Sequence, residues 1–377
     1  MADSMDKKYS NVPNLRFSNE SWNMVQIKEL CSVVSGGTPS TEESSFWNGN
    51  IQWFTPTEVG NNKYVTSSKR TITELGLKKS SAKLLPAGSI LLSTRATVGE
   101  ASICTKECTT NQGFQSLIPN NKCCNEFLYY LIQTKKKEMI KRSCGSTFIE
   151  ISNSQVGSIK VRIPSLEQQM KISKFLSHID KRIDTQNKII SDLKIELEEI
   201  SKKLFAMKNN EEKYLGDLCK ITTGKLDANR MVPDGKYRFY TCAEHYYYID
   251  EYAFDCEALL ISGNGANVGY IHYYNGKFNA YQRTYVLSNF VGVDAHYLKS
   301  YLDVYLKRRI DSEKNTGNMP YIKLDTLSKM RIKTPTMVEQ KKIAVSISNL
   351  SAKIETEQKI LDLYLKQKSY LLKNLFI

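Results

Sequence analysis

The chain repeats itself at a spacing of 171 residues. The stretch from Ile163 to Ile172 reads IPSLEQQMKI, and the stretch from Thr334 to Ile343 reads TPTMVEQKKI. Each stretch opens a long segment in which apolar residues recur every three to four positions, as they do on one face of a helix. A unit that is duplicated over roughly half of a chain predicts two similar modules, each ending in a long helix.

The apolar positions of both segments advance in steps of four and three, which is the period of a coiled coil. The polar positions, Gln186 and Glu357, are equivalent in the repeat, and a polar seam residue fixes register at some cost in stability. We expect an antiparallel two-helix coiled coil, rather than two separate core helices, with the second helix returning along the first. The predicted seam is Ile172, Leu176, Ile179, Ile183, Gln186, Ile190 and Leu193 in the first helix, and Ile343, Ile347, Leu350, Ile354, Glu357 and Leu361 in the second.

The charge balance favours a polyanionic partner. Lys and Arg number 53 against 39 acidic residues, giving a net charge of +14. Residues 1–163 hold the largest share of this excess, with 20 basic and 13 acidic side chains. A surplus of this size is typical of proteins that bind nucleic acid, although a basic soluble protein remains the alternative.

Cysteine usage and hydropathy indicate a cytoplasmic protein. The nine cysteines are odd in number and form no CxxC pair. No secretory segment follows Met1 and no apolar run is long enough to span a bilayer, so we expect reduced thiols and no membrane partner. Cys104 and Cys108 lack a second ligand pair and the four histidines are scattered, so we expect no metal site.

The regions that precede the two helices are similar in pattern. In the first, alternating apolar residues predict strands over 89–93 and 157–163, and an amphipathic helix over 126–142. The corresponding segments of the second are 259–261, 331–334 and 295–309. The fold class is therefore α+β: head one (1–163), a central helix (164–208), head two (209–334) and a C-terminal helix (335–377), with an internal pseudo-twofold repeat.

Motifs of catalysis are missing from the sequence. There is no GxxxxGK[ST] phosphate loop, no HExxH and no GxSxG. The run from Gly263 to Gly269 reads G-x-G-x-x-x-G without a βαβ context, and we interpret it as a turn. An amino-methyltransferase would need an Asn/Asp-Pro-Pro-aromatic sequence, which does not occur. We expect a non-catalytic protein.

Several motifs are spread along the whole length of the chain: an entry segment, a Gly-Gly-Thr-Pro loop, an Asn-Gln-Gly core and the boundary into each helix. Their residues are Val12–Phe17 with Trp22, Ser35–Ser40, Asn111–Phe114, Gly145–Ser152, Ile163–Gln169 and Thr334–Gln340. Through these residues the chain resembles the specificity subunit of a type I restriction–modification system along its whole length. Head two departs from the pattern, with GKLD from Gly224 in place of the Gly-Gly-Thr-Pro loop.

The resemblance implies how such a chain works. Each head is a mixed α/β target-recognition domain, and the two read the two halves of a bipartite, asymmetric target in double-stranded DNA. The helices set the spacer between the half-sites and dock two methylase subunits, which bring S-adenosylmethionine. Restriction/translocase subunits join for cleavage. This chain holds no cofactor of its own.

Candidate base contacts follow from chemistry, because Arg, Asn, Gln and small hydroxyls are the side chains that read base edges. Solvated loops or turn caps are the alternative for each residue. Gln112 and Gln282 occupy equivalent positions, where we expect structural hydrogen bonds. The tyrosines of head two (Tyr246, Tyr247, Tyr248, Tyr273 and Tyr274) either stack on bases or fill a β core. The candidates are Thr38, Ser40, Trp53, Lys63, Arg70, Thr94, Arg95, Ser146 and Thr147 in head one, and Lys225, Arg230, Arg238, Asn264, Asn267, Arg283, Asn318 and Tyr321 in head two.

Two other functions compete with DNA recognition. A coiled-coil adaptor would bind protein partners through its helices and peptides through its heads, without DNA specificity. An enzyme with an unrecognised nuclease centre would cut DNA alone in the presence of a metal. Steep salt dependence of DNA binding separates a DNA reader from the adaptor.

Overall fold

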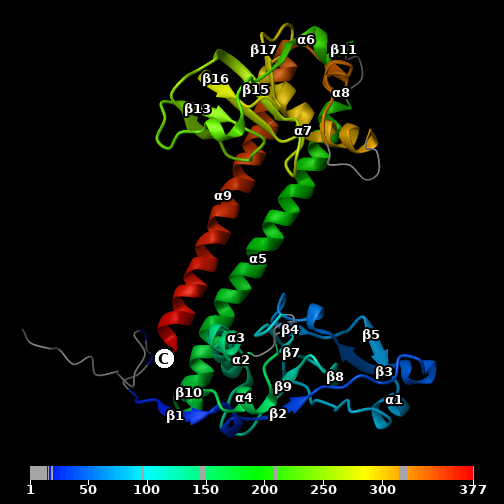
Figure 1. The fold of residues 1–377 in the computed structure, drawn as a ribbon, viewed down its shortest axis with the longest axis vertical. Coiled ribbons are helices and arrows are strands. Elements are labelled where there is room, and N and C mark those ends of the chain that lie inside the picture. Colours follow the sequence, from blue (N-terminus) through cyan, green and yellow to red (C-terminus); the bar gives the residue numbers. More distant parts are fainter. Residues whose placement is uncertain are drawn as a thin grey trace, which may run out of the picture. The chain divides into compact units, whose positions relative to one another are not determined.

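The computed structural model describes residues 15, 17, 20–95, 97–143, 150–206, 211–313 and 321–376. Contacts divide the chain into two compact units. Unit 1 comprises Met1–Thr185 and Leu361–Ile377, and unit 2 comprises Gln186–Ile360. Each unit therefore holds one head together with segments of both long helices. Figure 1 labels elements of both units where they can be seen.

Head one is built on three small sheets. A five-stranded sheet has the order β2-β9-β6-β7-β4, a three-stranded sheet has the order β5-β3-β8, and β1 pairs with β10. Its strands are β1 (Asn23–Gln26), β2 (Cys31–Ser35), β3 (Trp47–Phe54), β4 (Tyr64–Val65), β5 (Arg70–Ile72), β6 (Ile90–Leu92), β7 (Ala101–Cys104), β8 (Cys108–Thr110), β9 (Gln115–Pro119) and β10 (Lys160–Ile163). Its helices are α1 (Glu74–Lys78), α2 (Asn125–Thr134), α3 (Lys136–Arg142) and α4 (Asn153–Gly157), with 3₁₀ turns at Ile27–Glu29, Ser44–Phe46 and Pro56–Glu58.

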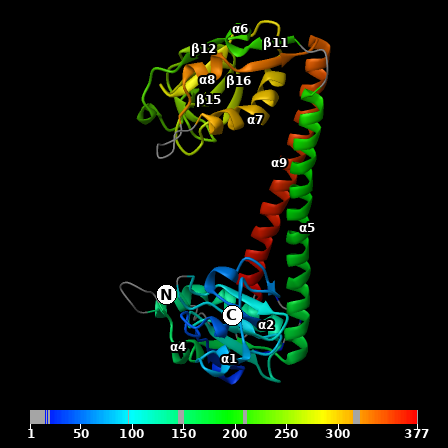
Figure 2. The ribbon, with the colours of Figure 1, turned by 90° about the vertical axis from the view of Figure 1, so that its right-hand side faces the viewer.

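Head two gathers most of its strands into one sheet. The six-stranded order is β12-β17-β15-β16-β13-β14, and β11 pairs with β18. The strands are β11 (Glu211–Tyr214), β12 (Lys220–Thr223), β13 (Tyr237–Tyr240), β14 (Tyr247–Ile249), β15 (Phe254–Ser262), β16 (Ile271–Ala280), β17 (Thr284–Ser288) and β18 (Arg331–Thr334). The helices are α6 (Leu215–Leu218), α7 (Ala295–Ser312) and α8 (Leu324–Ser328), with a 3₁₀ turn at Ala228–Arg230. In Figure 2, α7 lies beside β15 and β16.

The two heads share one strand order, which confirms the internal repeat. The order β2-β9-β6-β7 in head one matches β12-β17-β15-β16 in head two, and all of these neighbours are antiparallel. The closing pairs β1–β10 and β11–β18 also match. In both heads a strand pairs in parallel with the last strand of this core, β4 with β7 and β13 with β16. The mixed α/β architecture was thus readable from the sequence.

The predicted helix over 126–142 is wrong in one respect. It is divided into α2 and α3 at Lys135, whose backbone leaves the helical region at φ −94° and ψ 1°. The hydroxyl of Thr134 donates to the carbonyl of Leu131 at 2.7 Å, and such local bonds compete with the helical ladder. The predicted helix over 295–309 is observed as the uninterrupted α7.

The long helices, α5 (Leu166–Phe205) and α9 (Met337–Leu375), are antiparallel within each unit. In unit 1, the Lys368 ammonium lies 2.8 Å from the Asp180 carboxylate. In unit 2, Gln186 contacts Glu357, while further along α5 Leu197 shares a cavity with Ile347. Residue numbers therefore rise along one helix as they fall along the other. The seam positions that are buried are Ile172, Leu176, Ile179, Gln186, Ile190, Leu193, Ile343, Ile347 and Leu361; Ile183, Leu350, Ile354 and Glu357 are half-buried.

Candidate functional site

Two neighbouring glycines shape the loop that follows β2 in head one. A Cβ on Gly36 would lie 2.0 Å from the Asn111 carbonyl oxygen, and one on Gly37 would lie 2.3 Å from the Ser81 hydroxyl. No other residue fits at this distance, because real Cβ contacts are longer. The Gly-Gly-Thr-Pro motif is therefore required by close packing of the loop backbone. It leaves Ser40 exposed and Thr38 half-exposed.

Gln112 and Gln282 hold the equivalent loops in the two heads. In head one, the Thr38 hydroxyl donates to the Gln112 side-chain carbonyl. In head two, the Gln282 amide donates to the Asp227 carboxylate at 2.8 Å. The expectation of structural hydrogen bonds at both glutamines is confirmed. Both bonds fix the loop after the first strand of the main sheet, which in head two carries the exposed Lys225.

An arginine stacked on tryptophan marks the exposed side of β5. The Arg70 guanidinium carbon lies 3.5 Å from the Trp47 ring centroid, and the Trp47 and Trp53 rings meet edge to face at 5.1 Å. The indole N–H groups of Trp47 and Trp53 donate to the carbonyls of Ser40 and Gly37, each at 2.9 Å. Both indoles thus tie the Gly-Gly-Thr-Pro loop to the sheet. Arg70 itself is exposed.

Three predicted contacts in head one are corrected by burial. Trp53 is 5% exposed and Thr94 is fully buried, its hydroxyl donating to the Gly113 carbonyl at 3.2 Å. The Lys63 side chain is 10% exposed, and its ammonium is held by Glu126, Tyr130 and Ser177. Burial lowers the pKa of Lys63. All three side chains stabilise the head, since a buried side chain does not reach a base edge.

Arg95 is accessible but already paired. Its guanidinium lies 2.9 Å from the Glu150 carboxylate, and both side chains are about a third exposed or more. An exposed pair of this kind contributes little to stability, so Arg95 can exchange its partner for another anion. Ser146 and Thr147, predicted on the adjoining segment, lie outside the described residues.

Head two holds an arginine among tyrosines. The Arg238 guanidinium carbon lies 4.3 Å from the Tyr246 ring centroid and 4.5 Å from that of Tyr274. It also donates to the Tyr240 hydroxyl at 3.4 Å. Tyr246 and Tyr274 pack against a buried cluster, so the core alternative is confirmed for these two tyrosines.

The remaining tyrosines of head two differ in exposure. Tyr273 packs against the main core of unit 2 and donates its hydroxyl to Glu257 at 2.9 Å. Tyr247 is half-buried and meets the His245 ring at 4.7 Å, and Tyr248 is 42% exposed. Tyr248 is the exposed one of the five tyrosines, so stacking on bases remains a prediction for this residue.

The other candidates of head two lie on loops and strand ends. Arg283 is exposed, and Arg230 lies 3.9 Å from Glu251. The Asn267 amide donates to the Cys242 carbonyl at 3.3 Å, so its side chain joins two loops that are distant in the sequence. Asn264 and Tyr321 face each other in an isolated bridge, and Tyr321 is 53% exposed. Asn318 lies outside the described residues.

A pair of glutamines was missed as functional by the sequence reading. The side chains of Gln169 and Gln340 are 1% exposed, and their hydrogen bonds join the start of each long helix to its head. Their signal was present, because each lies five residues after a proline in both copies of the duplicated stretch.

Thiols and possible metal ligands are arranged as follows within the described part of the chain. The cysteines there are free thiols. Burial raises the pKa of Cys31, Cys123 and Cys219 to about 12 in each case. No group of three or more His, Cys, Asp or Glu residues gathers there as a metal site. None of the helices described is both long and apolar enough to cross a membrane.

Two copies of a mixed α/β head, each followed by a long helix of an antiparallel pair, make up the described part of the chain. The model of the type I restriction modification DNA specificity domain matches residues 19–195 and 207–363. The chain therefore belongs to this family, as its resemblance predicted.

Similar proteins agree with this assignment. The chain is 30% identical to the type I restriction enzyme MjaIX specificity subunit of Methanocaldococcus jannaschii, over 90% of this chain and 88% of that one. It is 39% identical to the EcoDI specificity subunit of Escherichia coli over 38% of this chain and 31% of that one. The crystal structure of a type I S subunit from M. genitalium has the same fold, with a TM-score of 0.64 and 18% identity over 97% of this chain and 99% of that one.

Proposed function

We propose that this chain selects the DNA target of a type I restriction–modification complex, with each head reading one half of a bipartite, asymmetric site. The observation that carries the proposal is the shared strand order of the two heads with different loops upon it. Related scaffolds with different loops suit two related but different ligands. The chain makes no bond-breaking step of its own in this proposal.

Arg70 and Arg238 are the side chains best prepared to read DNA. Each guanidinium lies over an aromatic ring, and neither is within 4.0 Å of a carboxylate among the described residues. Stacking holds the planar group in one orientation while its edge keeps free donors. An arginine held in this way donates two parallel hydrogen bonds to guanine, the commonest specific contact in the major groove.

Exposed cations supply the part of binding that does not depend on sequence. Lys225 and Arg283 are exposed on loops of head two. Contacts of lysine and arginine with phosphates position a protein on DNA and release counterions, which makes affinity fall steeply with salt. Head one, with its larger basic excess, contributes more of this term.

The helices complete the proposal. The antiparallel pairing of α5 and α9 within each unit supports a role as a spacer between half-sites and as a dock for two methylase subunits. S-adenosylmethionine and the modification of the base belong to those subunits. Restriction/translocase subunits would join the same assembly for cleavage.

One experiment tests the proposal in the assembled complex. The chain is coexpressed with its methylase and modified adenines are mapped across a genome. We expect one bipartite, asymmetric motif that disappears when this chain is omitted. Modification that is unchanged without the chain, or filter binding of duplex DNA by the purified chain that does not weaken with salt, would favour the adaptor function instead.

A further inference from the structure

Both heads are anchored to the long helices by equivalent phenylalanines. Phe205 and Phe376 lie 171 residues apart and therefore correspond in the repeat. In unit 2, the Phe205 ring lies 5.7 Å from that of Tyr297 on α7. In unit 1, the Phe376 ring lies 5.3 Å from that of Phe127 on α2. Each head is thus fixed at the root of its helices by a buried aromatic contact.

Head one has a second anchor further along the helices. The Tyr130 hydroxyl donates to the Asp180 carboxylate at 2.5 Å, and Asp180 is paired with Lys368 of α9 at 2.8 Å. Lys63, which directly precedes β4, adds hydrogen bonds to Tyr130 at 3.0 Å and to Ser177 of α5 at 2.8 Å. The Lys63 and Asp180 side chains are 10% and 13% exposed. Charged bonds in such surroundings are strong, so this anchor resists opening.

The same place in head two lacks every member of this anchor. Cys124 and Asp294 directly precede α2 and α7, and their backbone N–H groups donate to the equivalent Gln169 and Gln340. Cys124 and Asp294 are therefore equivalent. Tyr130 and Ser300 follow them at the same distance along the chain, so these two residues are equivalent as well. The repeat aligns Asp180 with Ser351 and Lys368 with Leu197. The loop of head one that carries Lys63, residues 55–69, is reduced in head two to residues 241–246.

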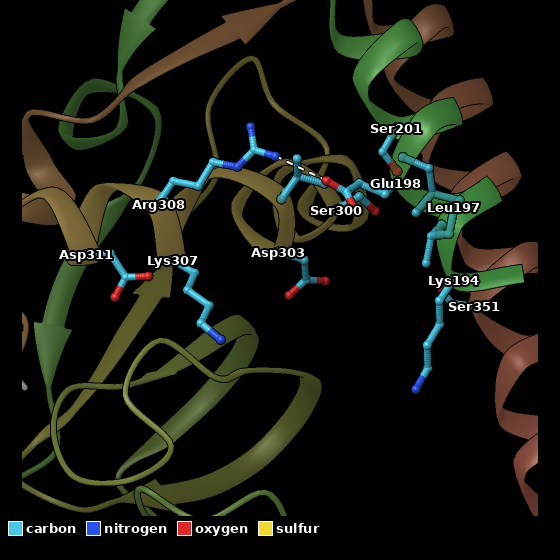
Figure 3. A pocket seen from close by; sticks show the side chains of 12 residues that line it. Lys194, Leu197, Glu198, Ser201, Ser300, Asp303, Lys307, Arg308, Asp311 and Ser351 are labelled. Carbon is cyan, nitrogen blue, oxygen red and sulfur yellow. Dashed lines mark hydrogen bonds and ion pairs between the residues drawn. The ribbon is translucent and has the colours of Figure 1, made fainter. Parts of the chain in front are cut away.

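A cavity of about 370 Å³ occupies this place in head two. Figure 3 shows Leu197, Ser300 and Ser351 on its wall. The Ser201 hydroxyl also lines it, and this buried group has no hydrogen-bond partner among the described residues. Cavities forfeit the packing that holds two elements together. The small side chains therefore leave head two without its second anchor.

An ion pair spans the mouth of the cavity. The Arg308 guanidinium lies 3.3 Å from the Glu198 carboxylate, with side chains 58% and 55% exposed (Figure 3). Glu198 also pairs with Lys202 at 2.6 Å. Exposed pairs are screened by water and salt and contribute little.

We infer that head two pivots on its helices about the Phe205 contact, whereas Tyr130, Asp180, Lys368 and Lys63 are positioning residues that hold head one at one angle. The consequence of this pivot for DNA binding rests on the proposed function. The half-site read by head two tolerates small changes of spacer length, because head two changes its angle to the helices. Head one does not adjust.

Distance distributions in the free full-length chain test the pivot without DNA. Spin labels are placed by an unnatural amino acid, which spares the native cysteines, at exposed positions on a head and on the adjoining helix. Lys78 and Lys174 report on head one, and Lys236 and Val345 report on head two. We expect a broader distribution for the head-two pair than for the head-one pair. Equal widths would overturn the inference.

Matched variants show what causes the difference. Leu197→Lys, Ser300→Tyr and Ser351→Asp together transplant the anchor into head two, and the head-two distribution should narrow. Arg308→Ala should broaden the head-two distribution only slightly further, because the exposed pair with Glu198 holds the head weakly, whereas Arg331→Ala, which breaks the exposed pair with Glu212 outside the cavity, should leave it unchanged. If the triple variant fails to fold, the wild-type widths and the two arginine variants still decide the question.

DNA binding then separates this inference from the proposed function. Cognate DNA with one base pair added to the spacer should bind wild type nearly as well as the original and should lose affinity for the transplanted variant. If the head-two distribution is broad but the chain does not bind cognate DNA, the proposed function is contradicted while the pivot stands. If the wild-type distribution is broad but wild type and the transplanted variant tolerate the longer spacer equally, the pivot exists but does not determine spacer tolerance.

Discussion

Gln186 of α5 donates its side-chain amide to Glu357 of α9, at 2.6 Å to the carboxylate and 3.0 Å to the backbone carbonyl, and the two residues are equivalent positions of the duplicated sequence. The helices therefore meet at the same point of the repeat. The bond lies in a seam that is otherwise apolar at its neighbouring positions, Ile183, Ile190 and Ile354. Only one register of an antiparallel pair brings these two polar groups together.

Replacing both partners should separate stability from register. Gln186→Leu with Glu357→Leu removes a polar pair formed by a buried and a half-buried side chain, and such replacements are neutral or stabilising by about 1–4 kcal/mol. Glu357→Leu alone leaves the Gln186 amide without its carboxylate and should cost about 1–3 kcal/mol. Urea unfolding measures both values. A double variant as unstable as the single one would contradict a role in register.

Gln169 and Gln340 make the same three hydrogen bonds in the two units. Gln169 accepts from the Cys124 amide at 3.0 Å and donates to the carbonyls of Lys122 and Pro164. Gln340 accepts from the Asp294 amide at 2.8 Å and donates to the carbonyls of Gly292 and Pro335. Each glutamine joins the start of a long helix to the segment before α2 or α7.

Replacement of either glutamine by leucine should destabilise its unit by about 1–3 kcal/mol, because buried backbone groups are left without partners. The two losses should be similar, since the bonds are the same. Gln168→Leu is the matched control: its side-chain oxygen is buried without a hydrogen-bond partner among the described residues, so its removal should cost little. Thermal unfolding of the three variants measures the ranking. A loss at Gln168 equal to that at Gln169 would count against the bonds.

The repeat, the seam and the α+β heads were predictable because they depend on patterns along the chain. Seam residues such as Leu176 recur at a fixed period, and Gln112 and Gln282 fall at equivalent positions. The order of strands in space was fixed only by pairings between distant segments, such as β2 with β9. Sequence periodicity carries no information about such partners.

The site residues were harder to predict, because polarity alone does not reveal burial. Lys63 was chosen for its charge, yet the fold surrounds it with Glu126, Tyr130 and Ser177. Thr94 was chosen for its hydroxyl, which donates a hydrogen bond to the backbone carbonyl of Gly113. Trp47, by contrast, gave no local sign that it would support Arg70, since the contact joins two different strands.

Buried thiols should make stability fall at alkaline pH. Burial raises the pKa of Cys219 from 9.0 to about 12, so above pH 9 the unfolded chain loses a proton that the native chain keeps. The unfolded state then binds fewer protons, and the free energy of unfolding falls as pH rises from 9 towards 12. Cys219→Ala should flatten this slope by up to about 1.4 kcal/mol per pH unit.

Urea unfolding between pH 8 and pH 11 measures the slope. Cys256→Ala serves as the comparison, because this half-buried thiol is reached by solvent and should change the slope less. An unchanged slope in the Cys219 variant would show that the buried thiol does not govern the alkaline loss.

Arg70 should contribute to recognition of one base. Arg70→Ala should weaken binding of cognate DNA by about 1–3 kcal/mol and relax specificity at one position. Arg70→Lys should keep the charge and lose the base discrimination, because lysine lacks the planar pair of donors. Filter binding with cognate and substituted duplexes measures both effects. Arg331→Ala, which also removes an exposed arginine, is the control; equal losses in the two alanine variants would mean that only net charge matters.

Lengthening both helices together should lengthen the spacer of the target. Seven residues inserted after Gln186 in α5 and seven before Glu357 in α9 preserve the seam and the contact between these two residues. They add about 10 Å of helix, which matches about three base pairs of DNA. Adenine mapping in cells that carry the methylase should find the same half-sites with a longer gap.

The position of the insertion follows from the structure. An insertion near Gln169 would separate this residue from the Cys124 amide and loosen head one, whereas the middle of the seam lies away from both glutamine contacts. An insertion in α5 alone shifts the register of the seam beyond Gln186 and should abolish modification. Loops in the heads read bases, whereas helix length sets only the distance between the heads. Altered half-sites with an unchanged gap would therefore mean that the helices do not measure the spacer.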